Sequence, residues 1–241
     1  KGTTNILSHT WVEGMILYHL LTGDDSVAEP IKQTRNWLMQ DEKLNFYEFS
    51  NCREAGWHII HLCSYYEAFT DYECLNAATL IIEKVLQHQN DNGGWTRMLT
   101  ESHCGCGYPR CSGEAGFMLS ILLSGLSRYY FYTQNEEVKQ SVVNGALWLI
   151  DNTFDDSTGH FRYTSCKNRT NGGGFQQTQW VIEGLSYAYF FSKNKNIGKH
   201  LQNAKATIGQ YPENLDHLGL GKALAQQMRY TPFILHMLPN D

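Results

Sequence analysis

Apolar and polar positions along this chain predict helices that come in pairs. The first segment of each pair is apolar on nearly every side, whereas the second carries lysines and glutamates on one face. A helix that is apolar all round is expected to be buried all round, and an amphipathic helix is expected to cover it. Stretches of alternating β-branched residues are few, so a sheet core is not expected. The predicted pairs are 11–21 with 26–39, 53–68 with 73–88, 115–132 with 136–150 and 179–191 with 197–208, followed by a partial unit at 222–237.

A short motif recurs in the four pairs and indicates an internal repeat. Gly14, Leu62, Gly125 and Gly184 each stand eight residues before a Thr or Ser, which is followed closely by Asp or Asn. We expect that Thr or Ser to cap the next helix by accepting a backbone N–H bond. Repetition at this scale predicts an all-α fold, an α/α toroid of four to five helical hairpins. It would be an incomplete six-hairpin barrel, or else a smaller or open ring.

Length and composition suit one such domain. We expect residues 1–241 to form a single α/α toroid. Because the chain begins in loop-like sequence, the protein could also contain an upstream portion or another domain. The apolar fraction of 42% supports a large interior, and the aromatic fraction of 13% suggests a groove with aromatic walls.

Charge narrows the class of partner. The formal net charge is −5 and no Lys/Arg cluster is present, which argues against a nucleic acid or an anionic membrane as partner. No run of about 18 apolar residues predicts a membrane span. Seven cysteines at uneven spacing do not resemble a disulfide framework, so the compartment stays open.

Four long loops join each second helix to the first helix of the next pair, at 41–51, 90–112, 151–174 and 210–221. Such loops would gather on one rim, at the N-termini of the first helices. Helix dipoles favour anionic groups there, and long loops in compact domains usually carry function.

Polar residues at the starts of the first helices are the candidates for catalysis. Paired carboxylates there would suit glycoside hydrolysis. A lyase would need a cation to neutralise a uronate, a base for the C5 proton and an acid for the leaving group. The candidate catalytic residues are His9, Glu13, Arg53, His58, Tyr108 and Arg110. For the repeated glutamates Glu13, Glu54, Glu114 and Glu183, a structural role is the stronger reading, in which each binds backbone N–H groups of a neighbouring hairpin.

Aromatic and amide side chains of the same region are candidates for substrate binding. Tryptophans could stack on sugar faces. The set is Trp11, Trp57, Trp95, Tyr163, Gln179 and Trp180. His61, one turn deeper than His58, is interpreted as a core histidine.

The loop at 103–111 could ligate a metal. His103, Cys104, Cys106 and Cys111 are zinc-ligand types, but their spacing departs from the usual two-residue gap. Free thiols or a disulfide are the favoured interpretation, and we predict no metal and no cofactor.

The segment 8–18 with 21–24 resembles the α/α-toroid domains of carbohydrate-active enzymes, and 51–57, 70–71 and 89–95 extend the likeness. It is most similar to the toroid domain of exo-rhamnogalacturonan-lyase-type polysaccharide lyases and to related bacterial proteins, although six-hairpin glycosidases share the pattern. No family catalytic motif matches, so the resemblance assigns no residue a role. The 89–95 segment also resembles repeats of terpene cyclases and prenyltransferases, whose aspartate-rich motif and zinc triad are absent.

Three hypotheses follow. The first is an enzyme domain that cleaves glycosidic bonds in an acidic poly- or oligosaccharide, as lyase or hydrolase. The second is a non-catalytic toroid that binds a glycan or supports a catalytic partner. The third is a terpenoid or prenyl enzyme, which would need a wholly apolar cavity.

Overall fold

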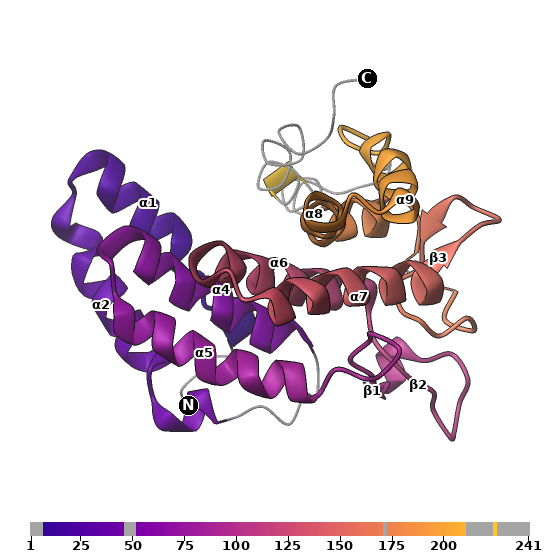
Figure 1. The fold of residues 1–241 in the computed structure, drawn as a ribbon, viewed down its shortest axis with the longest axis horizontal. Helices are drawn as coiled ribbons and strands as arrows, with labels where there is room; N and C mark the ends of the chain where they lie inside the picture. The colour runs from indigo at the N-terminus through magenta and orange to yellow at the C-terminus, as the bar shows by residue number, and fades with distance from the viewer. Residues whose placement is uncertain (1–6, 46–51, 171–172, 211–223, 226–241) are drawn as a thin grey trace.

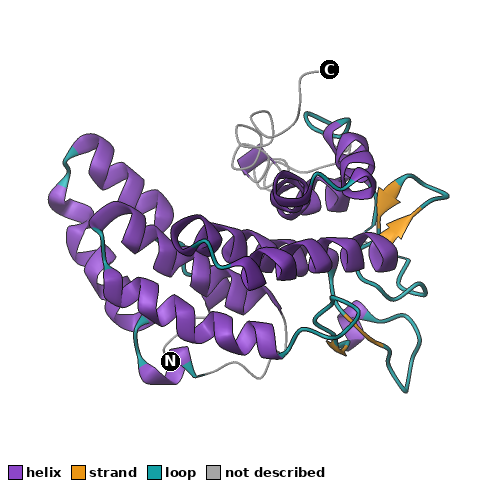
Figure 2. Ribbon diagram, viewed as in Figure 1, coloured by secondary structure: helices purple, strands orange, loops and turns teal. Residues whose placement is uncertain are grey.

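The computed structural model describes residues 7–45, 52–170, 173–210 and 224–225. In these ranges the chain forms four helical hairpins, arranged as an arc (Figures 1 and 2). The hairpins are α1 (Glu13–Thr22) with α2 (Ala28–Leu38), α4 (Cys52–Phe69) with α5 (Tyr72–Gln87), α6 (Gly116–Thr133) with α7 (Glu136–Thr153), and α8 (Phe175–Ser192) with α9 (Lys195–Lys205). The expected all-α toroid of repeated hairpins is confirmed, whereas all but two residues of the partial unit at 222–237 lie outside the described ranges.

Short elements fill the connections. They are α3 (Asp41–Leu44), three 3-10 turns at Leu7–His9, Asp25–Val27 and Glu101–His103, and two small antiparallel ladders. One ladder pairs β1 (Arg97–Met98) with β2 (Ser112–Gly113), and the other pairs β3 (Phe154–Asp155) with β4 (His160–Phe161).

The first helix of each hairpin lies in the inner layer. α4 packs on α6 and α6 packs on α8, while α5, α7 and α9 cover them from outside. Leucines of α6 fill the middle of this layer with no exposed surface: Leu119, Leu122, Leu123 and Leu126. Burying such side chains contributes about 1.5–3 kcal/mol each, so α6 is the centre of the hydrophobic core.

Glycines allow the inner helices to approach closely. A Cβ on Gly56 of α4 would lie 2.7 Å from the backbone carbonyl of Ile121 in α6. A Cβ on Gly125 would lie 2.7 Å from the carbonyl oxygen of Gly56. These two glycines therefore mark the point where the α4 and α6 backbones touch, which explains why the motif carries glycine at Gly125.

Burial of α1 differs from the expectation. We expected every first helix to be buried on all sides, and in α1 this is wrong: Leu17, Leu20 and Leu21 are 53%, 54% and 84% exposed. Ile16 alone among the residues of α1 is buried. The reason is position, since α1 lies at the end of the arc (Figure 1) and packs mainly against α2 and α4.

The turns inside the hairpins are capped by Asp or Asn rather than by the expected Thr or Ser. The carboxylate of Asp71 accepts from Cys74 N, and the side chain of Asn135 accepts from Glu137 N and Val138 N. The hydroxyl of Thr133 instead donates to the carbonyl of Tyr129, one turn back. The residue before each cap is left-handed: Gly23, Thr70, Gln134 and Lys193 have φ of 68°, 55°, 52° and 51°.

The expected common rim is confirmed for the two loops whose structure is described most fully. The 90–112 and 151–174 loops lie side by side at the N-terminal ends of α6 and α8 (Figure 1). A bridge pairs Ala115 with Thr164, and Ser165 N donates to the carbonyl of Glu114 at 2.9 Å. Residues 46–51 and 211–221 of the other two loops lie outside the described part. Among the helices that are described, none has the length and hydropathy needed to span a bilayer.

Candidate functional site on the inner helices and the loop rim

A carboxylate–guanidinium cluster lies on the inner layer of helices. Arg128 of α6 forms an ion pair with Glu13 of α1, and its Nη2 is also 3.7 Å from the carboxylate of Glu67 in α4. Its Nη1 donates to the Ser64 hydroxyl at 3.2 Å, and the Tyr132 hydroxyl donates to Glu67. Three inner helices therefore contribute to one polar cluster inside an otherwise apolar layer.

The electrostatics of the cluster keep Arg128 charged. Burial alone would lower the pKa of Arg128, but the neighbouring carboxylates of Glu13 and Glu67 outweigh it and raise that pKa well above its ordinary value. The side chains of Glu13, Glu67 and Arg128 are 27%, 32% and 20% exposed, so solvent reaches all three. Sequence reasoning identified Glu13 but missed Arg128 and Glu67.

Glu114 has the structural role that the repeat favoured. Its side chain is 1% exposed. One carboxylate oxygen accepts from Cys52 N at 3.2 Å and from Arg97 Nε at 3.2 Å. The other accepts from Ala115 N at 2.7 Å and from Arg97 Nη2 at 3.0 Å. This carboxylate thus fixes the start of α4 against the start of α6.

Glu54 acts in the same way one hairpin earlier. It accepts from Ser8 N at 2.9 Å and lies 3.6 Å from Arg53 Nη2. The structural interpretation therefore holds for Glu54 and Glu114, whereas Glu13 pairs with an arginine side chain instead. Glu183 is buried in α8.

On the rim, His103 lies between an arginine and a tyrosine. Arg97 Nη2 is 3.0 Å from His103 Nδ1, and the Tyr163 hydroxyl is 3.5 Å from Nε2. Burial, and then the charges of Arg97, Arg53 and Arg169, lower the pKa of His103 to about 4. The imidazole is therefore neutral near pH 7. Arg169 lies over the Tyr163 ring at 5.8 Å from its centroid.

Aromatic side chains form two groups. In the first, the ring of Phe117 contacts Tyr163 and, edge to face, Trp180, with centroids 5.6 and 5.4 Å apart. In the second, Trp11 lies 6.1 Å from His9 and 6.4 Å from Trp57, and Trp57 stacks on His61 at 5.5 Å. Trp11 is 62% exposed, and Trp57, Tyr163 and Trp180 are partly exposed, so four of the residues expected to bind substrate are reachable.

Three residues that we expected on the rim are buried instead. His58 has no exposed surface, and its Nε2 lies 2.9 Å from the carbonyl of Leu38. Trp95 is 3% exposed and donates from its indole to the carbonyl of Val85. Gln179 is also 3% exposed and donates to the carbonyls of Thr207 and Gln210. The His58 contact joins the second hairpin to the first, whereas Trp95 and Gln179 bond within their own hairpin and its following loop. Burial keeps all three from a substrate.

Other expected residues lie farther out. Tyr108 is 91% exposed in the 103–111 loop, and together with Arg110, Glu101 and Cys104 it lines a cavity of about 280 Å³. Tyr108 and Arg110 were expected to share one pocket with His9. In the described part of the chain they line this cavity together, whereas His9 contacts Ser8 and Trp11. Arg53 pairs with Glu54, and its charge contributes to the lowered pKa of His103.

A cavity of about 510 Å³ is lined by residues of the 155–174 segment. One of them is Arg169, which lies over the Tyr163 ring. The cations of this cavity are Arg162, Lys167 and Arg169, and its carboxylate is Asp155. Asp155 accepts from the hydroxyl and backbone N–H of Ser157, bonds that lower its pKa. The lining is thus positive on balance and lies at the N-terminus of α8.

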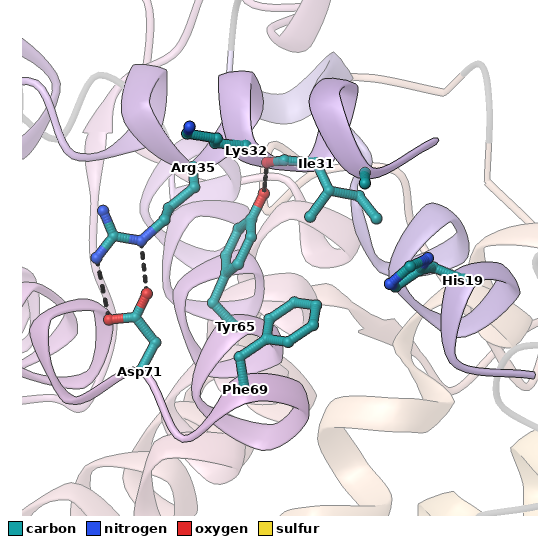
Figure 3. A pocket seen from close by; sticks show the side chains of 8 residues that line it. His19, Ile31, Lys32, Arg35, Tyr65, Phe69 and Asp71 are labelled. Carbon is teal, nitrogen blue, oxygen red and sulfur yellow. Dashed lines mark hydrogen bonds and ion pairs between the residues drawn. The ribbon is translucent and has the colours of Figure 1, made fainter. Parts of the chain in front are cut away.

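A second cavity, of about 300 Å³, lies at the turn end of the first two hairpins (Figure 3). Arg35 donates two hydrogen bonds to Asp71 and one to Glu73, and the Tyr65 hydroxyl donates to the carbonyl of Ile31. These polar groups hydrogen-bond to one another and link α2 to the second hairpin. They therefore offer little to a ligand.

Among the described residues, a metal could be held where the two rim loops meet. The sulfur atoms of Cys104, Cys106, Cys111 and Cys166 lie within 4.8 Å of one another. Sequence reasoning considered His103 with the first three cysteines and missed Cys166. His103 faces Arg97 and Tyr163 instead.

Comparison with known proteins gives matches only among solved structures. No protein-family model and no curated protein matches this chain. The GH76A α-1,6-mannanase of Salegentibacter sp. HEL1_6 aligns with a TM-score of 0.71 and 14% identity over 98% of this chain and 72% of that chain. Unsaturated glucuronyl hydrolase from Bacillus sp. GL1 aligns with a TM-score of 0.74 and 12% identity over 100% and 70%.

A family 105 glycoside hydrolase from C. acetobutylicum ATCC 824 aligns with a TM-score of 0.67 and 13% identity, over 97% of this chain and 72% of that chain. At these identities the alignments establish architecture. They support the glycoside hydrolase resemblance more specifically than the polysaccharide lyase one. This chain therefore has the α/α-toroid fold that these carbohydrate-active enzymes share.

Proposed function

We propose that this chain is a glycan-cleaving enzyme domain that hydrolyses a glycosidic bond with Glu13 and Glu67. The observation that carries the proposal is the pair of partly exposed carboxylates that share Arg128 on the inner helices. Because both contact one guanidinium nitrogen, they lie close enough to act on the same bond, as the carboxyls of glycosidases do at roughly 5–9.5 Å.

The two carboxylates would have different roles. Glu13, paired directly with Arg128, suits the ionised group that attacks the anomeric carbon or activates water. Glu67 is farther from Arg128, at 3.7 Å, and accepts from the Tyr132 hydroxyl; it would be the group that protonates the leaving oxygen. Support for paired carboxylates comes from the Salegentibacter mannanase, whose inactive variant has two aspartates replaced by alanine and binds α-1,6-mannotetrose.

An acidic sugar farther along the glycan would be recognised at the rim. Arg128 lies 12 residues from the start of α6, about 18 Å along the helix, so the substrate would have to be several sugars long. The cavity with Arg162, Lys167 and Arg169 offers cations at a helix N-terminus, where an anion is favoured. Trp57 and Trp180, which belong to the two separate aromatic groups, would each stack on a sugar ring. The charged cluster on the inner helices is unsuited to a terpenoid or prenyl substrate, which would require an apolar cavity.

The test incubates the protein with α-mannan, pectic and unsaturated uronyl oligosaccharides while reducing ends and unsaturated-uronate absorbance are followed. We expect reducing ends to increase on at least one substrate. A rise in absorbance without hydrolysis would identify a lyase, and binding without cleavage would identify a glycan-binding toroid; either result overturns the proposal.

Matched variants test the residues. Glu13→Gln and Glu67→Gln should each lower kcat by about 10²–10⁴-fold, the usual worth of a general acid or base. Glu136→Gln on the outer helix α7, which alters an exposed ion pair with Lys139 and a hydrogen bond from the Tyr130 hydroxyl, should retain full activity. Equal activity in all three variants would remove Glu13 and Glu67 from the mechanism.

A further inference from the structure

Four cysteines from two distant loops converge on one point of the rim. Cys104, Cys106 and Cys111 belong to the 90–112 loop, and Cys166 belongs to the 151–174 loop. The distances between sulfur atoms are 3.4 Å for Cys104–Cys111, 3.8 Å for Cys104–Cys166 and 3.3 Å for Cys106–Cys111. Cys106–Cys166 is 3.6 Å and Cys111–Cys166 is 3.4 Å.

These five distances are five of the six edges of a tetrahedron, and the sixth, between Cys104 and Cys106, is within 4.8 Å. Four thiolates bound to zinc at about 2.3 Å have sulfur atoms about 3.8 Å apart. Two disulfides would bring the sulfur atoms together in two close pairs, whereas these five sulfur–sulfur distances in the cluster are all similar. The structure assigns a Zn²⁺ site to Cys104, Cys106, Cys111 and Cys166, with four thiolate ligands and no open position.

Groups around the sulfurs fit a bound metal. Gly105 N–H points to Cys166 Sγ and Cys111 N–H to Cys104 Sγ, each at 3.5 Å, and Asn168 Nδ2 donates to Cys106 Sγ at 3.2 Å. Hydrogen bonds of this kind orient metal ligands and offset thiolate charge.

Backbone packing brings the loops to the required separation. A Cβ on Gly105 would collide with the carbonyl of Asn168, so only glycine allows the two loops to approach here. Thr164 donates from its hydroxyl to the carbonyl of His103, and Arg169 donates to the carbonyl of Ser102. The chain thus holds the ligands together through contacts that do not involve sulfur.

The site would be structural. Two of its ligands, Cys104 and Cys166, are 8% and 3% exposed, and four protein ligands leave no position for a substrate. Zinc here would fix the loop that carries His103 to the loop that carries Tyr163 and Arg169. It would therefore order the rim and would take no part in bond cleavage.

The experiment measures zinc in the full chain, purified under reducing conditions, by elemental analysis, and records the absorption spectrum after replacement by Co²⁺. We expect one zinc per chain and the visible bands of a tetrahedral cobalt tetrathiolate. Cys104→Ala and Cys166→Ala should each lose the metal and the bands. Cys63→Ala, a buried cysteine of α4 outside the cluster, should keep both.

Four results would overturn the assignment. They are a chain that contains no metal when purified in reductant, iron in place of zinc, zinc retained by both cluster variants, or zinc lost equally by Cys63→Ala. Since elemental content and the cobalt spectrum do not depend on turnover, the zinc site can be confirmed even if the chain proves to cleave no glycan.

Discussion

Burial of His58 makes stability depend on pH. The side chain has no exposed surface, and burial lowers its pKa from 6.5 to about 4. Between these values the unfolded chain binds a proton that the folded chain does not, so stability falls as pH falls through this window. The full contribution is present above pH 6.5, and the loss down to pH 4 is about 3 kcal/mol, at 1.36 kcal/mol per pKa unit.

Urea unfolding of the wild type and of His58→Gln measures this effect. We expect the wild type to lose about 3 kcal/mol more than the variant between about pH 7 and pH 4. His88→Gln, which alters an exposed histidine of the same hairpin, should follow the wild type. Parallel curves for all three proteins would mean that His58 does not titrate as its burial requires.

At the residue scale, the sequence could identify Glu13 of the polar cluster but not its partners Arg128 and Glu67. Glu13 stood out because Glu-Gly recurs at Glu183. Arg128 and Glu67 had no such signal, because neither falls at a repeated position of the motif. Arg128 is 115 residues from Glu13, and only the packing of α1 near α6 brings them together.

At the scale of the helices, N-cap residues stabilise the starts of α5, α7 and α9. Asn135 caps α7 by accepting from two backbone N–H groups, and an Asn-to-Ala change at an N-cap costs about 0.5–2 kcal/mol. We expect Asn135→Ala to lower the free energy of unfolding by about 1 kcal/mol, measured by urea denaturation. Gln140→Ala, at an exposed position within the same helix, should change it by less than about 0.5 kcal/mol. A similar loss in both variants would contradict the capping role.

Helix pairs could be predicted closely from the sequence, but the turn chemistry could not. The predicted helix at 53–68 became Cys52–Phe69. In the second hairpin the left-handed residue is Thr70, whereas in the first it is Gly23, one place after the corresponding threonine. The equivalent positions of the hairpins are the left-handed residue and the Asp or Asn cap that follows it. Measured from these positions, the threonine of the second hairpin is one residue out of register with the Thr or Ser of the others.

Across the whole molecule, the spacing of the inner helices depends on glycine. Gly125→Ala would place a Cβ 2.7 Å from the carbonyl oxygen of Gly56, and overpacking of this kind costs about 1–3 kcal/mol. Gly14 holds the corresponding motif position in α1 and has nothing within 4 Å of a Cβ. We therefore expect thermal unfolding to show a clear loss of stability for Gly125→Ala and none for Gly14→Ala. Equal effects would mean that backbone contact does not set the spacing.

Architecture was predictable because every hairpin repeats one local pattern. The rim was less predictable, since its contacts join residues far apart in loops that do not repeat. Three of the four clustered cysteines were visible as a group in the sequence. Cys166 was not, because contacts between distant residues, such as the pairing of Ala115 with Thr164, bring its loop to the others.

The division of the cysteine cluster between two loops has a consequence for biosynthesis. Cys166 follows Cys111 by 55 residues. At roughly 5–20 residues per second, the ribosome would release the first three thiols about 3–11 seconds before the fourth. During that interval the nascent chain would carry a reactive, three-quarters complete ligand set, so newly made protein would be more open to oxidation than the finished fold.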